Sequence, residues 1–167
     1  SFMLGSNNGI DLFDPLAIRF NQNLPKVLFT KLSILNQEVM PGDTVNNKVV
    51  LNQDISFTKE IHLDYSDKIF SLEFAAINST HPQKCQYKYM LEGFDDDWIY
   101  TGFDRRFASY SNLKDGHYTF KVLASNNDGK WGNNMAELMV HVLPPFWKSN
   151  WFRPLMIFIF LGAMALL

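Results

Sequence analysis

The fold is decided by one stretch, Tyr110-Ser111-Asn112-Leu113-Lys114-Asp115-Gly116-His117-Tyr118-Thr119-Phe120-Lys121-Val122-Leu123-Ala124-Ser125-Asn126. From Tyr118 to Ala124 every second residue is apolar, which predicts a β-strand with one buried face. Asp115-Gly116 has the composition of a tight turn, because Gly adopts a positive φ angle without steric cost. A second polar turn follows at residues 126–132. The stretch therefore predicts a strand between two turns.

Tyr118 opens this strand, two residues after the glycine. In immunoglobulin-like sandwiches a tyrosine at this position packs its ring in the core and hydrogen-bonds to backbone across the corner. We therefore expect Tyr118 and Gly116 to form a tyrosine corner with a structural role. The alternative is an ordinary strand between two polar turns.

The rest of the chain supports the sandwich. Further strands are expected at residues 26–35, near 49–51, and at 61–65, 68–76, 85–92, 105–110 and 135–143. Residues 94–103 are expected to be an acidic, aromatic loop. Roughly seven strands in about 120 residues predict an all-β, antiparallel sandwich of the immunoglobulin or fibronectin type III kind. The side chains expected to face inward are Leu28, Leu32, Ile34, Phe70, Leu72, Phe74, Cys85, Tyr87, Tyr89, Leu91, Ala136, Leu138, Val140 and Val142.

Residues 1–24 stand apart from this domain. Two short apolar segments flank the turn Gly5–Gly9, which predicts a β-hairpin. An isolated hairpin is marginally stable in water, so it needs neighbours. The sequence from Gly5 to Pro15 resembles the repeat of bacterial sensor β-propellers, which implies the remnant of a propeller blade. A polar hairpin without that ancestry is the alternative.

The C-terminal residues have a membrane-like pattern. Residues 144–153 form a linker with an aromatic and cationic belt suited to a membrane interface. The belt residues are Trp147, Lys148, Trp151, Phe152 and Arg153. Leu155–Leu167 is a run of 13 uncharged residues, whereas a bilayer needs about 20. We therefore expect residues 154–167 to begin a transmembrane helix that is truncated here; a core helix of a soluble protein is the alternative.

Composition restricts the function further. The net charge of −2 gives no reason to expect nucleic acid as a partner. The single cysteine, Cys85, excludes an internal disulfide and is compatible with the cytosol or with a secreted β-domain. We expect the chain to start inside a repeat, so the lack of a signal peptide does not indicate a location.

No catalytic, metal or cofactor site is predicted. The histidines have no metal-binding spacing, so we interpret them as scattered surface residues. Asp95-Asp96-Asp97 lacks the spacing of a calcium loop and is interpreted as a solvated turn. The loop aromatics form an expected interaction surface, either with a neighbouring domain or protomer or, alternatively, with sugars. They are Trp98, Tyr100, Phe103 and Trp131.

Four motifs in order resemble the Y_Y_Y domain family. They are Tyr87–Asp95 with Trp98, Arg105-Arg106, Tyr110–Phe120, and Asn126–Trp131. The family's spaced tyrosines correspond to Tyr87 or Tyr89, Tyr110 and Tyr118. The resemblance assigns residues 25–143 to an immunoglobulin-like Y_Y_Y domain.

The resemblance also implies a function. Y_Y_Y domains lie between the periplasmic two-propeller region and the transmembrane helix of hybrid two-component systems, which typically sense polysaccharide breakdown products. It therefore implies a non-catalytic signal-transmission module on the periplasmic side of the inner membrane. The implied partners are upstream propellers, the membrane and a second copy in a homodimer. A carbohydrate-binding or spacer domain of a cell-surface enzyme or adhesion protein is the alternative.

Overall fold

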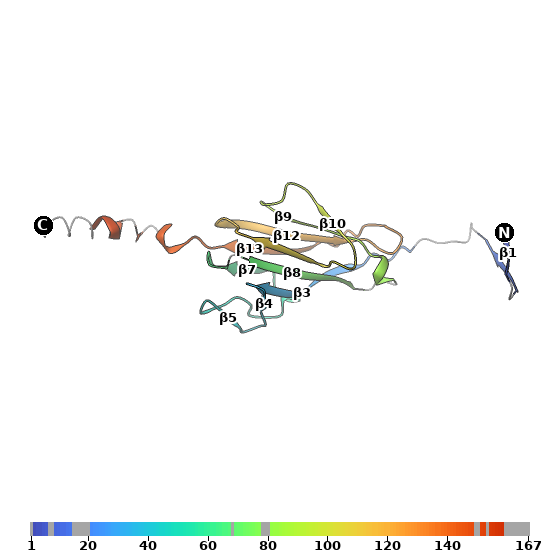
Figure 1. Ribbon diagram of the computed structural model, residues 1–167, viewed down its shortest axis with the longest axis horizontal. Coiled ribbons are helices and arrows are strands. Elements are labelled where there is room, and N and C mark those ends of the chain that lie inside the picture. The colour runs from blue at the N-terminus through green and yellow to red at the C-terminus, as the bar shows by residue number, and fades with distance from the viewer. Residues whose placement is uncertain are drawn as a thin grey trace.

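The computed structural model describes residues 2–6, 9–14, 21–67, 69–77, 81–148, 151–152 and 154–158. A two-layer β-sandwich lies between an N-terminal hairpin and a C-terminal helical segment (Figure 1). The described parts of the hairpin and of the helical segment lie on opposite sides of the sandwich along its long axis (Figure 1). This architecture confirms the predicted sandwich class.

Two sheets form the layers. The five-stranded sheet has the order β10 (Ile99–Thr101), β9 (Tyr87–Glu92), β12 (Gly116–Ala124), β13 (Ala136–Val142) and β7 (Glu60–Leu63). The four-stranded sheet has the order β11 (Phe107–Ser111), β8 (Ile69–Ile77), β3 (Lys26–Ile34) and β4 (Gln37–Glu38). Within these sheets the pairing is antiparallel except between β13 and β7, which are parallel.

Strand β12, from the stretch quoted first, is central in its sheet. It pairs with β9 on one side and β13 on the other, with Phe120 opposite Leu91 and Leu138. The ring of Phe120 is fully buried and packs against Phe29 and Phe74 of the other sheet, with centroid distances of 5.8 and 6.2 Å. The expected alternation is therefore confirmed, because this one face of β12 forms the centre of the core.

A β-bulge in β3 corrects one expected face. The register with β8 shifts between Phe29 and Lys31, so Thr30 has no opposite residue. Val27 and Phe29 are buried before the bulge, and Leu32 and Ile34 are buried after it. Leu28 was expected on that face and is only half-buried. The extra residue at the bulge moves the buried side chains from odd-numbered to even-numbered positions. A strict period of two along the whole strand therefore assigns Leu28 to the wrong face.

The other inward faces are confirmed, but several boundaries differ. Residues 94–103 were wrongly expected to be all loop, because β10 forms the edge of a sheet there. Strand β11 begins at Phe107 and not at Arg105. A small hairpin of β5 (Thr44–Val45) and β6 (Lys48–Val49) replaces the strand expected near residues 49–51. The described residues also contain three short 3-10 helices: η2 (Ile55–Phe57) and η3 (Pro82–Lys84) within the domain, and η4 (Phe146–Lys148) just after it.

Two described segments outside the sandwich also have regular structure. The predicted N-terminal hairpin consists of β1 (Phe2–Ser6) and β2 (Gly9–Phe13), paired from Phe2 with Phe13 to Ser6 with Gly9. Its turn residues 7–8 lie outside the described residues. After the domain, Phe152 and residues 154–158 are helical, and the Leu155 N–H donates to the Trp151 carbonyl.

The apolar C-terminal segment is described only in part. Residues 159–167 lie outside the described residues. Among the residues that the structure describes, no helix has the length and apolar character needed to cross a membrane.

Candidate functional site at the two ends of strand β12

The corner before β12 is built around Tyr118. Its hydroxyl donates a hydrogen bond to the Lys114 carbonyl at 3.0 Å, as a tyrosine corner requires. The residue with left-handed backbone in this corner is Asn112, with φ of 55°. Gly116 is instead the first residue of β12, opposite Val142. A glycine is needed at Gly93, where φ is +93° and an added Cβ would lie 3.2 Å from the Tyr118 ring.

Two other tyrosines connect the sheets. Tyr87 of β9 accepts a hydrogen bond from the Ala76 N–H of β8 at 3.1 Å. Tyr110 of β11 donates to Asp95, just after β9, at 2.6 Å. Burial raises the pKa of both hydroxyls, so they remain neutral. Tyr89 packs its ring against Phe74 at 5.7 Å, and burial raises its pKa as well.

The corner also holds the segment that leaves the domain. The Lys148 ammonium of η4 forms an ion pair with Asp115 at 2.5 Å. This hydrogen bond to Lys148 lowers the pKa of Asp115. One residue earlier, the Trp147 ring meets the Tyr65 ring edge to face at 5.4 Å. We call these two contacts the carboxy-terminal clamp.

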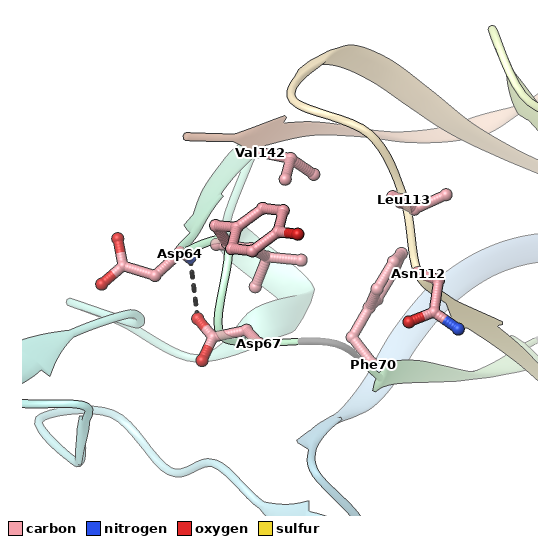
Figure 2. A pocket seen from close by; sticks show the side chains of 8 residues that line it. Asp64, Asp67, Phe70, Asn112, Leu113 and Val142 are labelled. Carbon is pink, nitrogen blue, oxygen red and sulfur yellow. Dashed lines mark hydrogen bonds between the residues drawn. The ribbon is translucent and has the colours of Figure 1, made fainter. Parts of the chain in front are cut away.

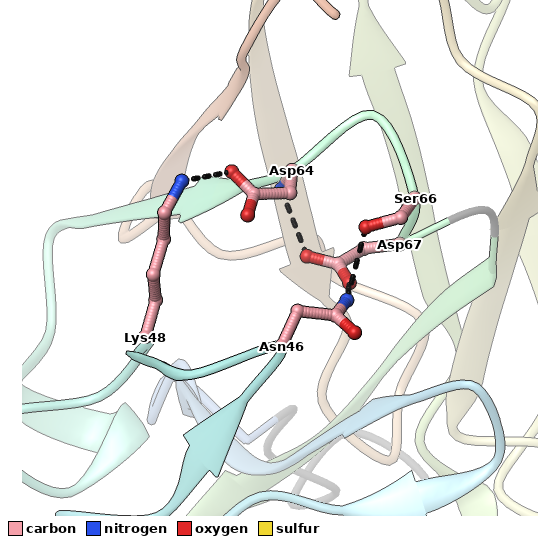
Figure 3. Close-up of polar contacts among 5 residues, drawn as sticks. All are labelled: Asn46, Lys48, Asp64, Ser66 and Asp67. Carbon is pink, nitrogen blue, oxygen red and sulfur yellow. Dashed lines mark hydrogen bonds and ion pairs between the residues drawn. The ribbon is translucent and has the colours of Figure 1, made fainter. Parts of the chain in front are cut away.

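The β7–β8 turn that carries Tyr65 is held in place by its own polar contacts (Figure 3). Asp67 is buried and accepts hydrogen bonds from the Asp64 N–H at 2.8 Å and from the Asn46 amide at 2.6 Å. Lys48 pairs with Asp64 at 2.6 Å. The bonds from Asn46 and Lys48 join the β5–β6 hairpin to the turn, so the turn that carries Tyr65 is held by contacts that do not involve Trp147.

Two hollows flank the carboxy-terminal clamp. A cavity of about 120 Å³ lies between the β7–β8 turn and the corner, where Phe70, Leu113 and Val142 line it (Figure 2). A groove of about 500 Å³ runs along the departing segment, from Leu143 to Trp147 on one side and past Tyr65 on the other. Within the described residues, the departing segment therefore contacts the domain mainly through the carboxy-terminal clamp, and the cavity and the groove lie beside these contacts.

The opposite end of β12 holds the segment that enters the domain. Asn126 is 2% exposed, and its amide donates to the Asn21 carbonyl at 2.6 Å. The Asn21 N–H donates in turn to Asp128 at 2.6 Å. Lys130 donates to Gln22 at 2.9 Å. We call these contacts the amino-terminal clamp; the sequence had indicated only a polar turn here.

The clamps therefore lie at the two ends of one strand. Asp115 immediately precedes β12, and Asn126 follows it by two residues. Both belong to the stretch that decides the fold. No sequence signal joined them to their partners, because these contacts connect residues that are 33 and 105 positions apart.

The predicted loop aromatics are brought together only in part. The Lys88 ammonium lies over two indole rings, 5.0 Å from the Trp98 centroid and 4.9 Å from the Trp131 centroid. Tyr100 meets Trp131 edge to face at 5.9 Å. Phe103 lies apart from this group, under the Arg106 guanidinium at 4.5 Å.

Two sequence interpretations of polar residues are corrected. Asp95 is not a free solvated carboxylate, since it accepts bonds from Tyr110 and from the Leu91 N–H. The histidines are not scattered, because His62, His117 and His141 lie side by side on one sheet. As the side chains lie, no group of three or more potential ligands in the described ranges is arranged to hold a metal ion.

The predicted belt residues are partly exposed. Trp147 and Trp151 expose 45% and 58% of their surface, although Trp147 and Lys148 also make the carboxy-terminal clamp. Phe152 meets the Phe146 and Trp151 rings edge to face. Arg153 lies outside the described residues.

Comparison with known proteins identifies relatives of this fold. The chain is 34% identical over 151 residues to Histidine kinase P4 of Formosa agariphila, covering 90% of this chain and 11% of that protein. One crystal structure of the extracellular domain of BT4673 from B. thetaiotaomicron, described as a one-component system, matches with a TM-score of 0.65. It is 27% identical, over 86% of this chain and 19% of that one.

A second crystal structure of that domain, described as a hybrid two-component system, gives a TM-score of 0.63 and 29% identity over 75% of this chain and 16% of that one. The chain thus spans a small part of each relative. Residues 78–143 match the Y_Y_Y domain family, and this match includes Tyr87, Tyr110, Tyr118 and both clamp residues of the deciding stretch. Over these residues the chain is similar to the Y_Y_Y domain family.

Proposed function

We propose that this chain is the extracytoplasmic signal-transmission module of a membrane-bound hybrid two-component sensor histidine kinase. Upstream propellers would bind the ligand, a polysaccharide breakdown product, and the kinase chemistry would belong to other parts of the protein. The observation that carries the proposal is the position of the two clamps. The incoming and outgoing segments are bonded to opposite ends of β12.

The module is expected to transmit motion as a rigid body. Strand β12 is bonded on both sides, and its nine residues at about 3.3 Å each span roughly 30 Å. Close-packed cores resist deformation. A displacement imposed on Asn126 would therefore reach Asp115, and through it the outgoing segment, with little loss.

The proposed output is a change between two copies of the chain. In a homodimer, a rotation of each sandwich would alter the spacing or angle of the two segments that follow Lys148. Those segments, residues 154–167, are proposed to begin the transmembrane helix on the periplasmic side of the inner membrane. Rigid-body rotation of subunits is a common form of signalling transition.

An insertion in the full-length receptor tests the coupling. Four flexible residues (Gly-Ser-Gly-Ser) placed after Leu143 would separate the outgoing segment from the sandwich and should abolish ligand-dependent autophosphorylation. The same four residues placed between Asp96 and Asp97, in an exposed loop, should leave the response intact. A normal response from the first variant would reject rigid coupling.

A carbohydrate-binding role has less support. Sugars stack on exposed aromatic faces, but the Lys88 ammonium already lies over the rings of Trp98 and Trp131. Isothermal titration of the chain with oligosaccharides would decide between the roles. Binding tighter than about 0.1 mM that is lost on Trp98→Ala would favour the carbohydrate-binding alternative.

A further inference from the structure

Three histidines form a row across the outer face of the five-stranded sheet. His117 of β12 is opposite His141 of β13, and His141 is opposite His62 of β7. The neighbours of His62 and His141 along the chain, Ile61 and Val142 among them, point into the core. The three imidazoles therefore project from the same side of the sheet, because side chains alternate along a strand.

The rings are close enough to act together. The Nδ1 atoms of His117 and His141 are in direct contact, with the rings edge to face at 4.7 Å between centroids. His62 stacks on His141 at 4.9 Å with an angle of 19° between the planes. The Glu60 carboxylate lies 3.7 Å from His141 Nε2 and adds negative charge to the row.

We propose that His117 and His141 form a surface site for a divalent transition-metal ion of the zinc class, with His62 as the third ligand. Imidazole nitrogens are preferred ligands of such ions. Two nitrogens that face each other can share only one hydrogen, whereas a metal ion accepts a lone pair from both. Tetrahedral coordination at 2.0–2.1 Å needs the two nitrogens about 3.3 Å apart.

Small side-chain movements would complete the site. The His117 side chain is exposed, so its ring can rotate to separate the two nitrogens. No three donors in the described residues converge on one point as they lie, and so His62 must turn away from its stack on His141. Its position on the next strand, opposite His141, places it within reach of the same ion.

The competing explanation is a structural row without a ligand. Cross-strand ring pairs also stabilise sheets by contact alone. In that case substitutions would change the stability of the domain equally with and without metal. The two explanations therefore differ in one measurable quantity, the dependence of stability on the ion.

Calorimetric titration of the tag-free 167-residue chain with ZnCl₂ at pH 7.5 tests the proposal. One ion should bind per chain. His117→Ala, His141→Ala and His62→Ala should each weaken binding by at least the roughly 10- to 100-fold that loss of an outer-shell partner costs. His81→Ala, at an exposed position before η3, is the matched control and should bind zinc normally.

Two further measurements keep the outcome clear. Zinc should raise the melting temperature of the wild type but not of His117→Ala, and metal-free unfolding shows whether each variant is folded. Absence of zinc binding by the wild type, or equal binding by His117→Ala, would overturn the site; equal binding by His62→Ala would remove the third ligand.

Discussion

The Tyr110 hydroxyl donates a hydrogen bond of 2.6 Å to the Asp95 carboxylate, which also accepts from the Leu91 N–H at 2.7 Å. Tyr110 belongs to the four-stranded sheet, and Asp95 follows a strand of the five-stranded sheet. Burial and then this carboxylate raise the pKa of Tyr110, so the hydroxyl remains a donor. One polar contact thus joins the two layers at their rim.

Tyr110→Phe should destabilise the domain by about 1.5–3 kcal/mol, the usual range for a hydrogen bond to a charged group. The ring would keep its packing on Phe70, but Asp95 would lose one donor. Urea unfolding followed by circular dichroism measures the change. Tyr100→Phe, at a side chain that is 66% exposed, should change stability by less than about 0.5 kcal/mol.

The tyrosine corner makes a second prediction. Tyr118→Phe should cost about 1 kcal/mol for one lost hydrogen bond and leave the proposed signalling response of the longer protein unchanged. Gly93→Ala should cost about 1–2 kcal/mol, because a side chain is strained in left-handed backbone. Its Cβ would also lie 3.2 Å from the Tyr118 ring. Equal stability of Tyr118→Phe and wild type in urea would contradict the corner interpretation.

The amino-terminal clamp can be opened at Asn126. Its side-chain oxygen accepts from the N–H groups of Asp128 and Lys130 at 3.0 and 2.9 Å. Asn126→Ala should therefore cost about 1–3 kcal/mol and speed hydrogen exchange at Asn21. Mass-spectrometric exchange measures both changes. Asn134→Ala, at an exposed position, is the control. If hydrogen exchange at Asn21 were the same in Asn126→Ala as in the wild type, the amino-terminal clamp would not hold the incoming segment on the domain.

The carboxy-terminal clamp should depend on acid. Because Lys148 lowers the pKa of Asp115 below its ordinary 3.8, the pair stabilises the fold fully above that value. Its contribution is lost as the pH falls through the lowered pKa. NMR titration of the Asp115 carboxyl carbon should show this low midpoint. In Lys148→Met the midpoint should move back toward 3.8, and an identical midpoint in both proteins would rule out the ion pair in solution.

The apolar C-terminal segment should drive association in water. Leu155, Met156, Ile157 and Phe158 expose between 44% and 78% of their surface in the single chain. Exposed apolar surface of this kind favours self-association. Analytical ultracentrifugation should show oligomers of the full chain and a monomer when residues 152–167 are removed. A monomer in both cases would exclude association through this segment.

Local periodicity explains what the sequence predicted well. Strands β8, β9, β12 and β13 each bury alternate residues along their length, and a period of two is visible in any single strand. Strand β10 was missed because it has three residues that lie at an exposed edge. The bulge at Thr30 was missed because it shows only in the register with a second strand.

The sites required information that a single sequence does not carry. His62 and His141 are neighbours because β7 and β13 pair in parallel, a register that no spacing of histidines indicates. Asp115 and Asn126 were visible as turn residues. Their contacts with Lys148 and Asn21 depend on where the chain enters and leaves the folded domain.

The position of the clamps also determines how the domain should respond to a mechanical load. A pull between Asn126 and Asp115 acts along β12, whereas the hydrogen bonds of β12 to β9 and β13 run across the strand. Those bonds would be sheared together and would not break one after another. In single-molecule stretching, force applied through the two clamps should therefore meet greater resistance than force that peels the edge strand β10 from β9.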